Sequence, residues 1–214
     1  MDIVYASNDF YARHLAVSII SLFDRNQQAE EITVYVLSVG ITEESRQKLQ
    51  KIADQYHRNL ELLDLTDIRD RFDYEIDTRG FDISAMGRLF APQVLPGTVK
   101  KALYLDCDTI VCHSIRPLYE TGLGDALVGM VMEPTVYREM KESIGLGKDD
   151  PYYNSGVLLM DLDRWRGEDV LKKLLDFYKS CQGRLFACDQ DTINGALKGR
   201  IKTLPVKYNY FTNY

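Results

Sequence analysis

Three short apolar runs separated by helical patterns decide the fold: IVYA at 3–6, ITVYVLSV at 32–39 and LELLDL at 60–65. Between the first two runs, residues 11–23 place apolar side chains at helical spacing. Between the last two, residues 42–56 predict a helix with Thr42 as its N-cap and acidic side chains in its first turn. This β-α-β-α-β order favours an α/β fold: a mostly parallel sheet with helices on both faces.

The rest of the chain continues the alternation. Strands are predicted at 101–105, 126–132, 157–161 and 201–204, and helices at 83–95, 165–180 and 189–197. Residues 66–82 are polar and resist assignment, and residues 133–152 lack a clean period and predict a mobile loop. Because no repeat, linker or low-complexity segment interrupts the pattern, residues 1–214 are interpreted as one domain.

Composition and charge disfavour several classes of function. The chain is 45% hydrophobic, enough for a full core, and its 26 basic and 32 acidic residues give a net charge of −6. Broad attraction to nucleic acid or to an anionic membrane is therefore disfavoured. The sequence shows neither a secretory signal nor the run of about 20 apolar residues that a membrane span needs. Its four cysteines form no Cys-x-x-Cys pair, so reduced thiols and a cytoplasmic location are expected.

In open α/β sheets, ligands bind at the carboxyl ends of the strands. The sequence has no Gly-rich dinucleotide motif after its first strand, no P-loop and no nucleophile elbow. A Rossmann dinucleotide site, a P-loop phosphate site and an α/β-hydrolase are therefore disfavoured. Asp106 and Asp108 follow the apolar run ALYL at 102–105. Two carboxylates at one strand end repel each other, and a hard divalent cation relieves that repulsion. The pair either binds a metal or is simply two solvated acids that cap the next turn, and the pattern alone favours neither interpretation. Asp-x-Asp is not a specific signal, because it occurs three times in the chain, also at 161–163 and 189–191.

Three further features carry two interpretations each. The YYNSG stretch at 152–156 is either a tight turn or a place where backbone, Asn154 and Ser155 approach a ligand. Asp189 is either a helix N-cap or, with Gln190, a sugar ligand. Arg88 lies in an apolar helical stretch, where it either extends to solvent or serves the site as a cation.

Six stretches together resemble the family 8 retaining glycosyltransferases, the group that contains bacterial lipopolysaccharide galactosyl- and glucosyltransferases and glycogenin. They are VYASNDFY at 4–11, ISAMGRLFAP at 83–92, ALYLDCD at 102–108, YYNSGVLLMDLDRW at 152–165, DQDTIN at 189–194 and LPVKYNY at 204–210. The 152–165 block and the DQD helix are specific to this family, whereas Asp-x-Asp is not. The resemblance implies a Rossmann-like domain of the GT-A type that binds a nucleotide sugar.

The resemblance also implies an activity: transfer of glucose or galactose from a UDP-sugar to an acceptor hydroxyl, with the anomeric configuration retained. The acceptor would be a glycan or a lipid-linked saccharide, as in lipopolysaccharide biosynthesis. Asp106 and Asp108 would hold Mn²⁺ (or Mg²⁺), which neutralises charge on the leaving diphosphate. Gln190 and Asp189 would act at the donor sugar. Because an amide is a poor nucleophile, front-face attack assisted by the leaving phosphate is favoured over a covalent glycosyl-enzyme.

The donor and nucleotide contacts implied by the resemblance come from several segments. They are Ala6, Asn8, Tyr11, Arg88, Asp106, Cys107, Asn154 and Ser155. Ala6 and Asn8 would contact the uracil, on which Tyr11 would stack. Asn8 stands where the family often has Asp, but its amide oxygen can still accept the uracil N–H. Phe10 replaces a polar residue of the galactosyltransferase branch, so details of nucleoside contact are expected to differ.

One family feature is missing. The family closes its site with a His-x-x-Gly-x-x-Lys-Pro-Trp stretch, whose His is a metal ligand and whose Lys meets the diphosphate. The chain contains no such stretch, its place falls beyond Tyr214, and none of His14, His57 and His113 substitutes for it. The domain is therefore expected to be truncated at its C-terminus. Any peripheral contact with the inner membrane would come through the missing region.

Two alternatives stay open. A sugar-nucleotide-forming nucleotidyltransferase shares the sheet and the metal carboxylates, but it needs a Gly-rich loop where this chain has SNDF at 7–10. A nucleotide-sugar-binding fragment or remnant without turnover is the second alternative, because the last metal ligand is missing. The sequence does not distinguish the donor hexose, the acceptor or the oligomeric state.

Overall fold

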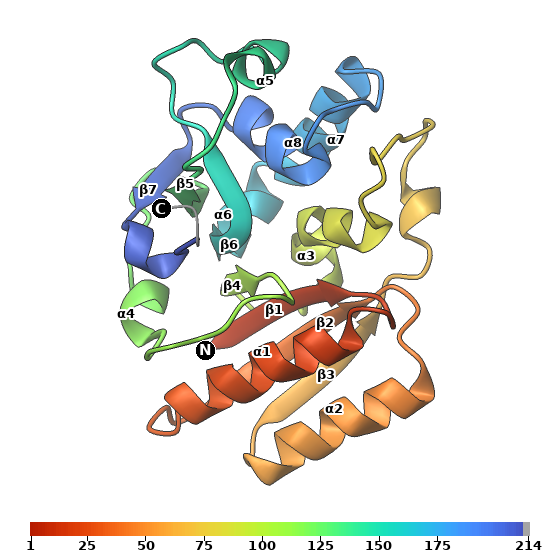
Figure 1. Ribbon diagram of the computed structural model, residues 1–214, viewed down its shortest axis with the longest axis vertical. Coiled ribbons are helices and arrows are strands. Elements are labelled where there is room, and N and C mark those ends of the chain that lie inside the picture. The colour runs from red at the N-terminus through yellow and green to blue at the C-terminus, as the bar shows by residue number, and fades with distance from the viewer. Residues whose placement is uncertain (212–214) are drawn as a thin grey trace.

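A seven-stranded mixed sheet runs through the structure in the order β3-β2-β1-β4-β6-β5-β7 (Figure 1). The structure, a computed structural model, describes residues 1–211. The strands are β1 (Asp2–Ser7), β2 (Thr33–Ser38), β3 (Asn59–Asp64), β4 (Lys101–Leu105), β5 (Val128–Met132), β6 (Tyr153–Asp161) and β7 (Ile201–Leu204).

Most neighbouring strands are parallel, as the sequence predicts. β1, β2, β3 and β4 run in one direction, and β5 pairs with β7 in parallel. Among the strands within residues 1–211, only β6 is antiparallel to its neighbours, β4 and β5. Because of this reversal, the first residues of β6 lie at the carboxyl end of β4: Leu105 pairs with Val157, and the Asp106 N–H donates to the Gly156 carbonyl at 2.8 Å. The two segments therefore meet at the edge where ligands bind.

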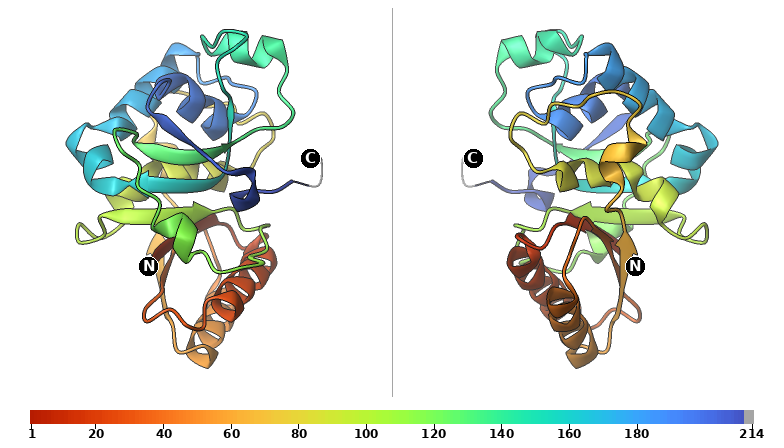
Figure 2. Two further views of the ribbon diagram at one scale, coloured as in Figure 1. Left: turned by 90° about the vertical axis from the view of Figure 1, so that its left-hand side faces the viewer. Right: turned by 90° about the vertical axis from the view of Figure 1, so that its right-hand side faces the viewer.

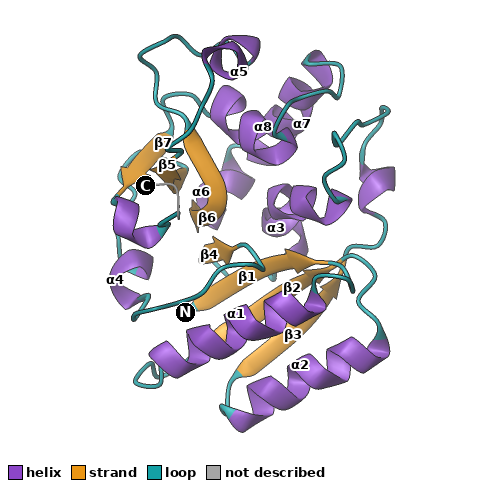
Figure 3. Ribbon diagram, viewed as in Figure 1, coloured by secondary structure: helices purple, strands orange, loops and turns teal. Residues whose placement is uncertain are grey.

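Helices cover both faces of the sheet (Figures 2 and 3). One face packs under α1 (Ala12–Arg25), α2 (Glu43–Gln55) and the short α4 (Arg116–Tyr119). The other face packs under α3 (Gly87–Val94), α6 (Leu162–Gly167), α7 (Val170–Ser180) and α8 (Cys188–Ala196). The alternation of strand side chains divides the core accordingly, as β1 sends Ile3 and Tyr5 to the first face and Val4 to the second.

Local signals explain where α2 and α6 begin. The Thr42 hydroxyl accepts a hydrogen bond from the N–H of Ser45 at 3.3 Å, which confirms the predicted N-cap of α2. Asp161 caps α6 in the same way through the N–H of Arg164. The buried indole of Trp165 then donates to the Leu127 carbonyl at 2.9 Å, which fastens α6 to the sheet.

Several predicted elements differ in the structure. The predicted helix 83–95 is a 3-10 turn, η2 (Ile83–Met86), followed by α3. The predicted helix 165–180 is split into α6 and α7 at Asp169, whose φ of 49° is left-handed and breaks the helical path. The predicted loop 133–152 contains α5 (Arg138–Ser143). Two further 3-10 turns, η1 (Ile68–Arg71) and η3 (Val206–Tyr208), complete the elements, and within residues 1–211 no helix has the length and hydropathy to cross a membrane.

Candidate active site

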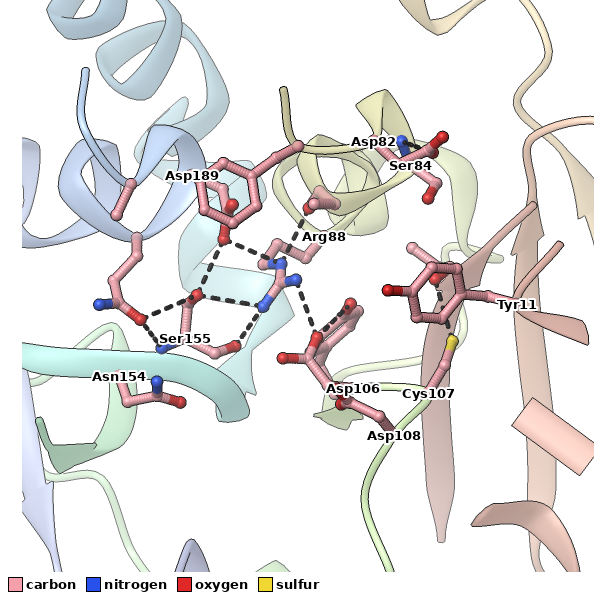
Figure 4. A pocket seen from close by; sticks show the side chains of 16 residues that line it. Tyr11, Asp82, Ser84, Arg88, Asp106, Cys107, Asp108, Asn154, Ser155 and Asp189 are labelled. Carbon is pink, nitrogen blue, oxygen red and sulfur yellow. Dashed lines mark hydrogen bonds and ion pairs between the residues drawn. The ribbon is translucent and has the colours of Figure 1, made fainter. Parts of the chain in front are cut away.

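An open cleft of about 380 Å³ lies at the carboxyl ends of β1 and β4 (Figure 4), within the usual size range of small-molecule sites. Except for Asn8, every site residue named from the sequence lines this cleft. Its wall is formed by Ala6, Tyr11, Phe81, Asp82, Ser84, Ala85, Arg88, Tyr104, Asp106, Cys107, Asp108, Asn154, Ser155, Ala187, Asp189 and Gln190.

Arg88 projects from α3 and joins three other elements. Its Nη2 lies 2.8 Å from Oδ1 of Asp106, and its Nε lies 3.0 Å from Oδ2 of Asp189. Its Nη1 donates to the hydroxyl and the carbonyl of Ser155. The guanidinium also lies over the Tyr104 ring, 4.5 Å from its centroid, where cation–π attraction adds to the pairing. Arg88 is therefore buried among site residues, and the interpretation that it extends to solvent is wrong.

The charge of Arg88 is secured by its partners. Burial alone would lower the pKa of the guanidinium, but Asp106 and Asp189 raise it above its usual value. Burial raises the pKa of Asp189, and the adjacent Arg88 opposes that shift. We therefore describe this cluster as one buried cation between two carboxylates.

Asp106 uses only one of its carboxylate oxygens in this cluster. Oδ1 accepts from Arg88 and from the Tyr104 hydroxyl at 3.1 Å, whereas Oδ2 is the oxygen that faces Gly156. A methyl group at Gly156 would lie 2.9 Å from Oδ2, so glycine is needed for this close approach. Asp108 is exposed and lines the same cleft.

A divalent cation is compatible with this donor set. Among the described residues, no three His, Cys, Asp or Glu side chains are grouped as metal ligands. Asp106 and Asp108 nevertheless both line the cleft and supply hard carboxylate oxygens to it, and Mg²⁺-type ions are commonly held by one or two carboxylates together with substrate phosphates. The residues present therefore fit a cation that is shared with a phosphate ligand.

Asp189 and Gln190 lie near the start of α8. The N-cap position of α8 is Ala187 and has no side-chain cap, so the interpretation of Asp189 as an N-cap is wrong. Asp189 instead accepts from the Ser155 hydroxyl at 2.9 Å in addition to pairing with Arg88. The Oε1 atom of Gln190 accepts the N–H of Ser155 at 2.9 Å. These contacts join α8 to β6 inside the cleft.

The stretch at 152–156 is not a tight turn, because β6 already begins at Tyr153. Asn154 has its amide held from three sides: Oδ1 accepts from the Gly156 N–H at 2.7 Å and from Asn209 Nδ2 at 2.8 Å, and Nδ2 donates to Glu133 at 2.9 Å. Asn154 therefore reaches the cleft in a fixed orientation.

The cleft and the sequence-based site differ in two respects. Asn8 does not line the cleft; its Oδ1 accepts from the Tyr11 N–H at 3.0 Å at the start of α1, and its contact with uracil stays a prediction. Conversely, Phe81 and Asp82 line the cleft, although nothing in the aperiodic stretch before residue 83 indicates it, and Ser84 lines it from within the 83–92 stretch. Only the neighbouring 83–92 motif could have pointed to them.

Known proteins resemble this chain over nearly its whole length. Lipopolysaccharide 1,2-glucosyltransferase of Escherichia coli K12 is 28% identical over 214 residues, 98% of this chain and 62% of that protein. General stress protein A of Bacillus subtilis is 24% identical over 212 residues, 98% of this chain and 73% of its own. The crystal structure of galactosyltransferase LgtC with donor and acceptor sugar analogs is 31% identical with a TM-score of 0.85, covering 97% of this chain and 74% of LgtC.

The relatives are longer than this chain, which spans about 62% and 73% of the two curated proteins. The model of the family "Glycosyl transferase family 8" matches residues 2–214. This match removes the nucleotidyltransferase alternative, because it covers the sheet, both aspartates and the DQD helix at once. The chain belongs to glycosyl transferase family 8.

Proposed function

We propose that this chain is a retaining hexosyltransferase that moves glucose or galactose from a UDP-sugar to a hydroxyl of a glycan or lipid-linked saccharide. The observation that carries the proposal is one cleft in which Asp106 and Asp108 lie with Asp189, Gln190 and Asn154. Carboxylate oxygens suit a divalent cation, which can in turn hold a diphosphate, and the amide and carboxyl groups suit sugar hydroxyls. The names of the relatives, lipopolysaccharide 1,2-glucosyltransferase and galactosyltransferase, support the hexose class.

Asp106 and Asp108 would hold the divalent cation, which we propose to be Mn²⁺. When bound, the cation neutralises charge that develops on the leaving diphosphate. Arg88 has a different task in this chain, because its guanidinium is occupied by Asp106, Asp189 and Ser155. It orients the carboxylates and keeps Oδ1 of Asp106 engaged, which leaves Oδ2 for the cation.

The contacts of α8 favour front-face attack. A double displacement needs a free nucleophile on the far side of the anomeric carbon. Asp189 is paired with Arg88 and accepts from Ser155, and Gln190 carries a poorly nucleophilic amide. We therefore propose that the acceptor hydroxyl attacks on the face of the leaving group and passes its proton to the departing phosphate oxygen.

Tyr11 would contact the nucleoside. Its ring lines the cleft and is 39% exposed, so one face is available to a base. Ala6 and Cys107 line the cleft beside it, and the Cys107 thiol donates to the Ala6 carbonyl at 3.2 Å. Burial raises the pKa of this thiol to about 12, so Cys107 serves as a neutral wall rather than as a nucleophile.

The test is sugar release and transfer with UDP-glucose and UDP-galactose in the presence of Mn²⁺. Wild type is compared with Asp108→Asn and with Asp163→Asn, which alters an exposed aspartate of another Asp-x-Asp copy that pairs with Lys100. We expect Asp108→Asn to lose most activity and Asp163→Asn to retain it. Equal activity in all three proteins would contradict the metal role.

Calorimetry with UDP and Mn²⁺ separates catalysis from binding. Binding accompanied by transfer supports the proposal. Binding without transfer to water or to any saccharide acceptor instead supports the alternative of a nucleotide-sugar-binding protein without turnover. Failure to bind UDP with Mn²⁺ contradicts both.

A further inference from the structure

We infer that Tyr152 is a positioning residue: together with Asp191 it fixes which end of the Gln190 amide faces Ser155 and the cleft. The placement of these groups is independent of any substrate, whereas the catalytic consequence rests on the proposed function. Neither Tyr152 nor Asp191 lines the cleft, and the Tyr152 hydroxyl contacts the cleft wall through Gln190, so its effect on the reaction would pass through that amide.

Tyr152 and Asp191 form a buried pair beneath the cleft. Their relative exposures are 2% and 0%, and the Tyr152 hydroxyl lies 2.6 Å from Oδ1 of Asp191. The other carboxylate oxygen accepts the Ala187 N–H at 2.8 Å. Both carboxylate oxygens of Asp191 accept hydrogen bonds, so the hydrogen of the Tyr152 hydroxyl points at Asp191.

This commitment sets the direction of the Gln190 amide. With its hydrogen used, the Tyr152 oxygen can only accept, and Gln190 Nε2 lies 3.2 Å away as the donor. The carbonyl oxygen of the same amide then accepts the Ser155 N–H at 2.9 Å. In a flipped amide, the NH₂ group would face the Ser155 N–H, donor against donor, and the carbonyl oxygen would face the Tyr152 oxygen, acceptor against acceptor. Only the unflipped orientation therefore satisfies both neighbours.

The attachment of α8 to β6 uses bonds that do not involve the Tyr152 hydroxyl. Asn194 accepts the Tyr153 N–H and donates to the Tyr153 carbonyl, both at 2.8 Å, and it also donates to the Gln190 carbonyl at 2.8 Å. These bonds hold α8 on β6. Loss of the Tyr152 hydroxyl should therefore release the Gln190 side chain without displacing the helix.

The orientation matters for the proposed transfer. Glycosyl transfer passes through an oxocarbenium-like state with positive charge near the anomeric carbon. The carbonyl end of an amide stabilises such charge, whereas its NH₂ end opposes it. If Gln190 faces the donor sugar, the Tyr152–Asp191 pair keeps the favourable end of the amide in place. Its loss would lower kcat and leave KM for the donor unchanged.

The test compares Tyr152→Phe with Tyr153→Phe, which removes a hydroxyl from the next residue, also buried and bonded to Thr203 at 2.8 Å. We expect Tyr152→Phe to lower kcat about 10-fold or more with KM unchanged. Tyr153→Phe should stay near wild type. In a Gln190→Ala background, Tyr152→Phe should have no further effect, because its action passes through the missing amide. Full additivity of the two changes would overturn the inference.

A second readout needs no substrate. The side-chain amide proton of Gln190 that bonds the Tyr152 hydroxyl, assigned in ¹⁵N-labelled protein by its absence in Gln190→Ala, should exchange slowly with water in wild type. Exchange should accelerate in Tyr152→Phe and not in Tyr153→Phe. Unchanged exchange in Tyr152→Phe would overturn the inference. If wild type transfers no sugar, the proposed function fails while this measurement still decides the placement.

Tyr152→Phe leaves the buried Asp191 carboxylate without the hydroxyl that bonds it, which destabilises the variant. The double variant Tyr152→Phe/Asp191→Asn removes that charge and retains an oxygen for the Ala187 N–H. The same acceleration of Gln190 amide exchange is expected there. Slow exchange in a folded double variant would count against the inference as well.

Discussion

The guanidinium of Arg88 lies 2.8 Å from the Asp106 carboxylate, inside a cleft where the arginine side chain is only 6% exposed. The contact links α3 to the end of β4, two elements that are separate in sequence. Because Arg88 also pairs with Asp189, a single cation balances two carboxylates that would otherwise repel each other. Stability and site geometry therefore depend on the same side chain.

Replacing Arg88 by methionine should strongly destabilise the fold. The change leaves Asp189 buried without its cation, which should lower the free energy of unfolding by about 3 kcal/mol. This is the lower end of the range for a broken buried pair, because the second carboxylate, Asp106, is 32% exposed. For a chain of this length the melting temperature should fall by roughly 6–12 °C. The matched control is Arg138→Met, which breaks an exposed pair with Glu142 and should change the melting temperature little.

The Arg88→Met variant should also respond to pH in a defined direction. Burial raises the pKa of Asp189, and Arg88 opposes that shift more than any other group does. Without Arg88, the folded protein binds a proton at Asp189 more readily than the unfolded chain does, so stability rises as pH falls through the folded-state pKa. The difference in melting temperature between Arg88→Met and wild type should therefore become smaller as the pH is lowered from 8 to 5. A constant difference across that range contradicts this assignment.

Gly156→Ala should weaken cation binding without unfolding the protein. The added methyl carbon would lie 2.9 Å from both Asp106 Oδ2 and Asn154 Oδ1, so both side chains must shift. If Asp106 holds the cation, affinity for Mn²⁺ in the presence of UDP should fall about 10-fold or more. Gly167→Ala is the control, because nothing lies within 4 Å of a Cβ at that position. Equal calorimetric affinities in the two variants would remove Asp106 from the cation site.

Sequence patterns anticipated the parts of this structure that depend on local periodicity. The run at 102–105 placed Asp106 and Asp108 at the ligand edge, because an apolar strand ends there. The break between α6 and α7 at the left-handed Asp169 could not be predicted, since one residue barely changes a helical period. The choice between the two interpretations of Arg88 was also out of reach, because its partners come from β4, β6 and α8. Only tertiary packing brings those segments together.

Thiol labelling should separate the buried cysteines from the exposed one. Burial raises the pKa of Cys107 and of Cys188 to about 12 each, so at pH 8 only about one thiol in ten thousand is a reactive thiolate. Cys112 is exposed. Iodoacetamide at pH 8 should modify Cys112 and spare Cys107 and Cys188 until the protein unfolds, as read by peptide mass spectrometry. Labelling of Cys107 as fast as Cys112 in folded protein would show that the cleft wall opens.

Asn194→Ala should uncouple α8 from the sheet. Asn194 is 2% exposed, and its amide satisfies both the N–H and the carbonyl of Tyr153 at 2.8 Å. Alanine leaves these two backbone groups unpaired in the core, which should cost about 2–3 kcal/mol.

The measurement is thermal unfolding, where this loss corresponds to a fall of roughly 4–12 °C in the melting temperature. Asn59→Ala serves as the control, since Asn59 is exposed and its side chain bonds to the exposed Glu31. Asn194→Asp should be at least as destabilising as Asn194→Ala, because a carboxylate cannot donate to the carbonyls of Tyr153 and Gln190 and places a charge in the core. Because α8 also carries Gln190, transfer activity should fall in Asn194→Ala even at temperatures where the variant is fully folded. Equal melting temperatures for Asn194→Ala and Asn59→Ala would mean that packing alone, and not this amide, holds α8 on β6.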